Sequence, residues 1–320
     1  MAESIAPQME ELCRGEVHAV RVSHSAFHAM SGHAHAVESE EIVGVLLGEH
    51  VGLPGGGVVC IVHAVRPMKR ADRRKDRVEV SPEDLSSCVV HAEELQAKTG
   101  HATQIVGWYH SHPHITIHPS HVDLNTQSQF EATNKNAVGL IVSCFDARGS
   151  VELGAFQTQN VSSEPITNLG ALSERDMTVL ESKDHAAFEW NMNAAFKVSN
   201  FPSHVSHEGK GNDGHLGRKW HPVFLFDGNP CFEVYCKRAL IDVPLLLLEE
   251  EQELFEKAMA ACEKEEALRR LHHQNVFIKS LCLLSSSVPI DMRDMMKDTI
   301  ERVKSKVESG MAELAMTSSQ

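Results

Sequence analysis

Two histidines two residues apart, followed by a serine and an aspartate, are the residues of this chain best suited to chemistry. His110 and His112 are separated by one serine, and Ser120 and Asp123 follow downstream. A catalytic zinc ion takes three protein ligands of nitrogen and oxygen type and leaves one position open for water. His110, His112 and Asp123 form such a set. The spacing therefore predicts one catalytic Zn²⁺ per chain.

The elements around these residues must bring them together. The apolar segment 104–109 before the histidines predicts a buried strand, and residues i and i+2 of a strand point to the same side. Both imidazoles are therefore expected to face one metal ion. Ser120 and Asp123 also have the spacing of a capping box at the start of a helix. A helix that begins there would hold Asp123 rigidly toward the metal.

This pattern resembles the JAMM motif of the MPN family of zinc isopeptidases. The resemblance rests on Glu41-Ile-Val-Gly44, the His110 and His112 pair, and Ser120 with Asp123. Segments 74–83, 107–116 and 138–145 are similar to one branch of that family, the deubiquitinase subunits of BRISC complexes. The resemblance covers 17–158 closely, fades over 159–235, and returns as a helical pattern from about 243. It implies an α/β fold: an MPN (JAMM) core of a mixed sheet flanked by helices, then a C-terminal helical, coiled-coil extension.

The resemblance also implies the catalytic roles. A zinc ion can lower the pKa of water from about 15.7 toward 7, and a base must take the proton that is released. By spacing either Glu40 or Glu41 fits this role, and family position favours Glu41. Ser120 would donate a hydrogen bond to the tetrahedral oxyanion, an interaction typically worth about 3 kcal/mol.

The implied activity is hydrolysis of isopeptide bonds in lysine-63-linked polyubiquitin, with roles in DNA damage or ubiquitin signalling. Two alternatives stay open: an isopeptidase for another linkage or a ubiquitin-like modifier, and a scaffold whose MPN core only docks partners. The intact set of Glu, His, His, Ser and Asp argues against the scaffold. Two positions depart from the family pattern. His118 stands where relatives carry a large apolar residue, and Val43 replaces a methionine.

Composition limits the remaining possibilities. The 44 acidic residues against 30 basic ones argue against nucleic acid as the main partner. Eight cysteines without Cys-x-x-Cys spacing are typical of a reduced compartment, although Cys231 and Cys236 leave a second, structural zinc site open. No apolar run approaches the roughly 18 residues of a membrane helix, and the start lacks the features of a secretory signal. We therefore expect a cytoplasmic and nuclear protein.

The chain divides by its patterns into five parts. They are an acidic leader (1–16), the catalytic domain (17–158), a flexible insertion rich in Ser, Asn, Gly and Lys (159–219), a strand-like return to the core (220–243) and C-terminal helices (244–320). Inside these parts we expect a helix over 23–40 with Ser23 as its N-cap and a helix from Ser81 to about Thr99. We also expect a hairpin of 43–47 and 58–65 with its turn at the glycines 52 and 55–57, and strand structure at 223–226 and at Phe232, Val234 and Tyr235.

The C-terminal helices carry an apolar seam. Its residues recur at spacings of three and four: Met292, Met296, Ile300, Val303, Val307, Met311 and Leu314. This is close to a coiled-coil pattern, but about three heptads are marginal alone, so the seam needs a partner helix from this chain or another. The resemblance implies that the partner is a catalytically inactive MPN subunit of the Abraxas type, in a hetero-oligomer.

Overall fold

The computed structural model describes residues 15–53, 56–70, 72–74, 77–79, 82–145, 151–160, 187–188, 196–198, 216–259, 301–302 and 304–305. The chain forms two compact units, Met1–Cys236 and Lys237–Gln320.

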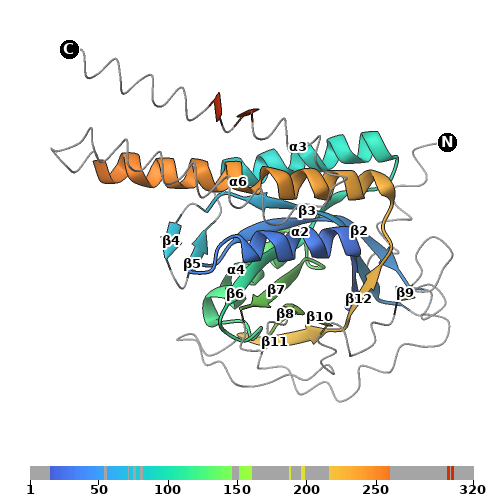
Figure 1. The fold of residues 1–320 in the computed structure, drawn as a ribbon. Coiled ribbons are helices and arrows are strands. Elements are labelled where there is room, and N and C mark those ends of the chain that lie inside the picture. The colour runs from blue at the N-terminus through green and yellow to red at the C-terminus, as the bar shows by residue number, and fades with distance from the viewer. Residues whose placement is uncertain are drawn as a thin grey trace, which may run out of the picture. The chain divides into compact units, whose positions relative to one another are not determined.

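The first unit is built on one mixed sheet (Figure 1). Its strands are β1 (Val17–Ser23), β2 (Val43–Gly52), β3 (Val58–Met68), β6 (Gln104–Pro113), β7 (Val138–Cys144), β8 (Val151–Asn160), β9 (Ala187–Phe188), β10 (Phe196–Val198), β11 (Leu216–His221) and β12 (Val223–Phe226). The strand order is β10-β8-β7-β6-β2-β3-β1-β12-β9, with β11 paired to β8. The pairs β1–β3, β1–β12, β6–β7 and β8–β10 are parallel, and the others are antiparallel. The predicted mixed-sheet α/β core is confirmed.

Helices cover both faces of this sheet. Neighbouring residues of a strand point to opposite faces. From β6, the Tyr109 hydroxyl lies 3.0 Å from His33 Nδ1 on α2 (His24–His35), whereas Trp108 donates to Gln127 on α4 (His121–Thr133). Helices α2 and α4 therefore pack on opposite faces, and Trp108, His110 and His112, which alternate along β6, lie on the face of α4.

Helix α2 begins as predicted and ends earlier. Ser23 is its N-cap, with Oγ accepting from the Ala26 amide at 3.1 Å. The helix ends at His35 rather than at Glu40. The segment after His35 is acidic, and carboxylates near a helix C-terminus interact unfavourably with the helix dipole. Glu40 and Glu41 consequently lie on the extended segment that leads into β2.

The hairpin of β2 and β3 forms at the predicted place and is longer than predicted. Gly44 in β2 leaves room for a neighbouring side chain. A Cβ atom there would lie 2.3 Å from Cε1 of Tyr109 and 2.5 Å from the Arg66 carbonyl oxygen. The tyrosine ring can therefore cross β2 directly beside the start of that strand. Beyond the hairpin, β4 (Asp72–Arg74) and β5 (Arg77–Glu79) form a separate two-stranded sheet, and α3 (Pro82–Thr99) follows as predicted.

Part of the range predicted as an insertion belongs to the sheet. Strand β11 pairs with β8 from Leu216↔Asn160 to His221↔Ala155, so the return to the core begins before residue 220. The short strands β9 and β10 also join the sheet. The other residues between 161 and 215 lie outside the described residues, and a flexible insertion there stays a prediction.

The strand expected at Phe232, Val234 and Tyr235 is wrong, because α6 (Pro230–Met259) begins before them. The Asn229 side chain accepts from the Cys231 amide at 2.9 Å, and proline is favoured in a first helical turn. Phe232 is fully buried, whereas Val234 is 58% exposed, which fits a helical period. A short run of aromatic and branched residues does not distinguish a strand from a buried helical turn.

The described part of the second unit is helical. Helix α6 continues through it to Met259, and Asp242 accepts hydrogen bonds from Arg238 at 3.0 Å and from Arg302 at 3.1 Å. The apolar seam from Met292 to Leu314 lies outside the described residues. None of the helices that the structure describes is both long enough and apolar enough to cross a membrane.

Candidate metal centre

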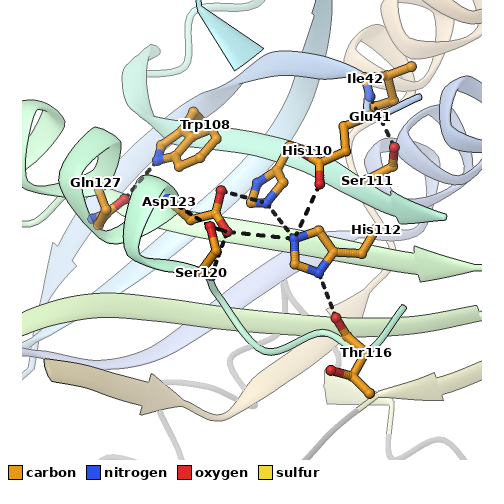
Figure 2. A network of polar contacts seen from close by, with 10 residues as sticks. All are labelled: Glu41, Ile42, Trp108, His110, Ser111, His112, Thr116, Ser120, Asp123 and Gln127. Atoms are coloured by element: carbon orange, nitrogen blue, oxygen red, sulfur yellow. Dashed lines mark hydrogen bonds and ion pairs between the residues drawn. The ribbon is translucent and has the colours of Figure 1, made fainter. Parts of the chain in front are cut away.

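His110 and His112 of β6 meet Asp123 of α4 at one buried point (Figure 2). The two Nε2 atoms lie 3.0 Å apart, and Asp123 lies 3.3 Å from His110 Nε2 through Oδ1 and 3.7 Å from His112 Nε2 through Oδ2. Their ligand atoms all lie within 4.8 Å of one another. Within the described residues this is the only group of three or more His, Cys, Asp or Glu side chains that converges in this way.

The capping box of α4 fixes the carboxylate. Asp123 Oδ2 accepts from the Ser120 amide and from the Ser120 hydroxyl, each at 2.7 Å, while Ser120 Oγ accepts from the Asp123 amide at 3.3 Å. This confirms the predicted capping box. The Ser120 hydroxyl therefore lies beside the converging atoms, with its proton directed at Asp123.

The two histidines are oriented in different ways. Nδ1 of His112 lies 2.6 Å from the Thr116 carbonyl oxygen, so this nitrogen donates its proton to that carbonyl and Nε2 is the ring nitrogen that faces Asp123. Nδ1 of His110 is buried and has no hydrogen-bond partner among the described residues. The His110 ring instead stacks on Trp108, with centroids 4.7 Å apart and planes 10° apart.

The charges at this point are strongly coupled. Burial alone would raise the pKa of the Asp123 carboxyl. The charge of His110 and hydrogen bonds from His110, His112 and Ser120 outweigh burial and hold that pKa well below its ordinary value. Burial would lower the pKa of His112, but Asp123, the Thr116 carbonyl and Glu41 together raise it. The centre is therefore anionic at its carboxylate and favours a cation.

The donor set fits a divalent metal ion of the zinc type. Two imidazole nitrogens aimed at one carboxylate repel each other unless a proton or a metal ion lies between them. Two nitrogen ligands and one oxygen ligand also match the three-ligand sets of catalytic zinc sites.

The structure separates Glu40 from Glu41. Glu41 Oε1 lies 4.0 Å from His112 Nε2, so the Glu41 carboxylate borders the three converging side chains. Glu40 Oε2 instead accepts from Arg70 Nη1 at 2.8 Å, and the same Arg70 atom lies 3.3 Å from the Glu41 carbonyl oxygen. Of the two predicted candidates for the base, only Glu41 is placed at the centre.

Backbone contacts hold the Glu41 segment against β6. The Ile42 amide donates to Ser111 Oγ at 3.0 Å, and the Ser111 amide donates to the Ile42 carbonyl at 3.1 Å. Residue spacing did not single out Ser111 or Arg70. A serine between two histidines is too common a neighbour to indicate a role, and Arg70 is distant in the sequence.

Other candidates lie elsewhere. Cys231 is exposed and Cys236 is buried, with burial first among the causes that raise the Cys236 thiol pKa to about 12, and neither joins a metal-binding group among the described residues. His118, the departure from the family pattern, packs its ring edge-on to Trp220 at 5.8 Å. The Ala137 carbonyl and Gln127 form a buried network with Trp108 that sequence spacing did not reveal.

Two family models match the chain. The model described as "JAB1/Mov34/MPN/PAD-1 ubiquitin protease" matches residues 15–136, and the "BRCC36 C-terminal helical domain" matches residues 236–309. Together they cover more than half of the chain.

Curated proteins are similar over nearly the whole length. The Lys-63-specific deubiquitinase BRCC36 of Bos taurus is 29% identical over 91% of this chain and 92% of its own length. The human protein of that name is 29% identical over 89% of this chain and 90% of its own, and that of Xenopus tropicalis is 27% identical over 93% and 95%. Among solved structures, protein DSY2949 of Desulfitobacterium hafniense matches with a TM-score of 0.34 and 20% identity over 43% of this chain and 82% of its own, which is too weak to support an argument.

Proposed function

Because the chain belongs to the JAB1/Mov34/MPN/PAD-1 family of ubiquitin proteases and carries a BRCC36-type C-terminal helical domain, we propose that it is a zinc-dependent deubiquitinase that hydrolyses isopeptide bonds of lysine-63-linked polyubiquitin. The observation that carries the proposal is the convergence of His110, His112 and Asp123 next to the Glu41 carboxylate. The linkage is taken from the names of the similar curated proteins.

His110, His112 and Asp123 would hold one zinc ion. When bound, such an ion lowers the pKa of water toward neutrality and polarises the substrate carbonyl. The chain's own residues do the rest. Glu41 borders the ligands and is only 12% exposed, so it can take the proton of the attacking water and hand it to the leaving lysine amine.

Ser120 would stabilise the oxyanion that forms on the scissile carbonyl. Its hydroxyl donates to Asp123 Oδ2 in this structure, so it must rotate to donate to the substrate. Its position at the N-cap keeps it within the centre throughout that rotation. A donor of this kind is typically worth about 3 kcal/mol of transition-state stabilisation.

The acting form is proposed to be a complex. The C-terminal helices would pair with a catalytically inactive MPN subunit of the Abraxas type, in the cytoplasm and nucleus. This chain matches the BRCC36 C-terminal helical domain over residues 236–309 and is similar to proteins named BRCC36, and these similarities support pairing through the C-terminal helices.

The test is cleavage of a panel of di-ubiquitin linkages by the purified chain, alone and with an Abraxas-type partner. We expect zinc-dependent cleavage of the lysine-63 linkage, loss of that cleavage after chelation, and recovery when zinc is restored. Preferential cleavage of another linkage, or of a ubiquitin-like modifier, would favour the alternative that the chain is an isopeptidase for that substrate. Bound zinc without cleavage of any substrate in the presence of the partner would favour a scaffold.

A further inference from the structure

The two histidines of the centre differ in what fixes them. A histidine that binds a metal usually donates its other ring N–H to a carbonyl or carboxylate, and that bond sets the ring plane. His112 has this bond, to the Thr116 carbonyl. His110 lacks it among the described residues, although its Nδ1 is buried. No described residue therefore sets the plane of the His110 ring through a hydrogen bond at Nδ1.

The contact available is the indole of Trp108. Trp108 precedes His110 by two residues on β6, so both side chains lie on the same face of the strand. Their rings are nearly parallel, at 10° and a centroid distance of 4.7 Å, and Trp108 is 3% exposed (Figure 2). An indole held in one orientation limits the plane that the imidazole can adopt.

Gln127 holds the indole. Its Oε1 accepts from Trp108 Nε1 at 2.8 Å, and its Nε2 donates to Glu131 Oε1 and to the Ala137 carbonyl, each at 2.8 Å. Because both acceptors face the amide nitrogen, the amide oxygen must face the tryptophan. Glu131 is itself fixed by the Thr158 amide of β8, at 2.8 Å. The Gln127 amide therefore has one orientation.

The fold makes space for this amide. Gly139 of β7 lies opposite Trp108 in the sheet, and a Cβ atom there would lie 3.0 Å from Gln127 Oε1 and 2.6 Å from the Phe156 ring. Gln127 also lies four residues after Asp123, on the same side of α4. One helix thus supplies both the carboxylate of the centre and the amide that fixes the tryptophan.

We propose that Trp108 and Gln127 are positioning residues for the His110 imidazole, with the Gln127–Trp108 hydrogen bond setting the plane of the indole and the indole setting the plane of the ligand ring. The proposal rests on the proposed function, because it assigns His110 to a metal ion. It adds a support that acts on one ligand only, through ring stacking in place of a hydrogen bond.

The test measures metal affinity in the full chain. Zn²⁺ affinity is determined by competition with a chromophoric chelator, and the visible absorption of Co²⁺ reports ligand geometry. Gln127→Leu should weaken Zn²⁺ binding by about tenfold to a hundredfold, the usual effect of removing a support for a metal ligand, and should alter the Co²⁺ spectrum. Trp108→Phe keeps a ring but removes the N–H donor, and should weaken binding in the same range.

Gln157→Leu is the matched control. Gln157 is also buried, and its Nε2 donates to the same Ala137 carbonyl at 2.9 Å and to the Lys135 carbonyl at 3.2 Å. Gln157→Leu should lower the stability of the fold as Gln127→Leu does. It should leave the Co²⁺ spectrum unchanged and the Zn²⁺ affinity within about twofold of that of the unchanged chain, a difference in binding free energy close to experimental error.

A double-mutant cycle tests whether Gln127 acts through Trp108. In the Trp108→Phe background, Gln127→Leu should weaken Zn²⁺ binding by less than about twofold, because the hydrogen bond is already gone. Equal effects in both backgrounds, or equal effects of Gln127→Leu and Gln157→Leu, would overturn the proposal. If Gln127→Leu does not fold, the affinity and Co²⁺ spectrum of Trp108→Phe decide alone, and unchanged values overturn it. Failure of the unchanged chain to bind either ion would overturn the proposed function together with this inference.

Discussion

Glu40 and Glu41 are neighbours in the chain, but their carboxylates lie in different surroundings. Glu41 borders the histidines, whereas Glu40 pairs with Arg70. Glu41→Gln should therefore keep zinc and the fold while slowing isopeptide cleavage by at least about a hundredfold, the lower size of a general acid–base contribution. Glu40→Gln is the matched control and should slow cleavage much less. Equal rates for the two variants, measured on lysine-63-linked di-ubiquitin with zinc content checked, would remove Glu41 from its role.

Single residues also show how far sequence reasoning reaches. The convergence of His110, His112 and Asp123 follows from strand alternation and a capping box, which are local rules that can be read from spacing. The separation of Glu40 from Glu41 depends on Arg70, which approaches from another part of the chain. Local rules do not contain that contact, and the sequence alone left both glutamates open until family position favoured one.

At the scale of elements, two helices begin with serine caps that differ in what else they touch. Ser23 caps α2 and donates to the His63 carbonyl at 2.8 Å, whereas Ser120 caps α4 and binds Asp123. Ser23→Ala and Ser120→Ala should each lower the free energy of unfolding by about 1 kcal/mol. Only Ser120→Ala should also slow cleavage, by about a hundredfold to a thousandfold. Urea unfolding and di-ubiquitin assays separate the two effects, and similar loss of activity in both variants would make Ser120 a purely structural residue.

Elements were predicted best where a cap or a turn signal marks them. Ser23 gave the start of α2, and the glycines after Gly52 marked the hairpin. The end of α2 was predicted too late, because the acidic residues after His35 interact unfavourably with the helix dipole. The start of α6 was also predicted too late, because the hydrogen bond from the Cys231 amide to Asn229 begins the helix within a segment whose apolar residues resemble a strand. Strand β11 was set too late because its pairing with β8 joins residues that are far apart in the sequence.

At the scale of the whole molecule, two buried histidines predict sensitivity to acid. Burial, with the nearby charge of Arg70, lowers the pKa of His33 to about 3, and burial with Lys219 and His18 does the same for His221. The unfolded chain binds these protons below about pH 6.5, and the folded chain only near pH 3. Stability is therefore complete above pH 6.5 and falls as pH decreases toward 3, by up to about 1.4 kcal/mol per pH unit for each group.

Replacing one of these histidines should flatten that dependence. His33→Gln, measured by urea unfolding from pH 7 to pH 4.5 in the presence of a chelator, should show a smaller loss of stability than the unchanged chain. The chelator is needed because acid also releases metal ions from their ligands. His121→Gln, at an exposed position, is the control and should leave the slope unchanged. A slope that His33→Gln does not alter would show that other groups cause the acid sensitivity.

The C-terminal helices give a second prediction at this scale. Removing residues 290–320, or changing Ile300 and Val303 to Asp, should leave zinc bound while abolishing co-purification with the proposed MPN partner and most cleavage. The reason is that a short seam needs a partner helix, and small misplacements of reacting groups cost large factors in rate. A truncated chain that stays monomeric and cleaves as fast as the intact complex would show that these helices have another role.

The β2–β3 hairpin has a consequence for how the length of this chain can change. Val43 pairs with His110 at one end of β2, while the other end, at Gly52, lies beyond the register shift between Leu46 and Leu47. Extra residues between β2 and β3 would lengthen their connection, which costs little free energy, and would leave the glutamate and histidines in register. One extra residue between Glu41 and Leu46 would move Glu41 along β6 by about 3.3 Å and reverse the faces of the intervening side chains. Insertions and deletions among related chains should therefore collect at 53–57 and be absent from 41–46.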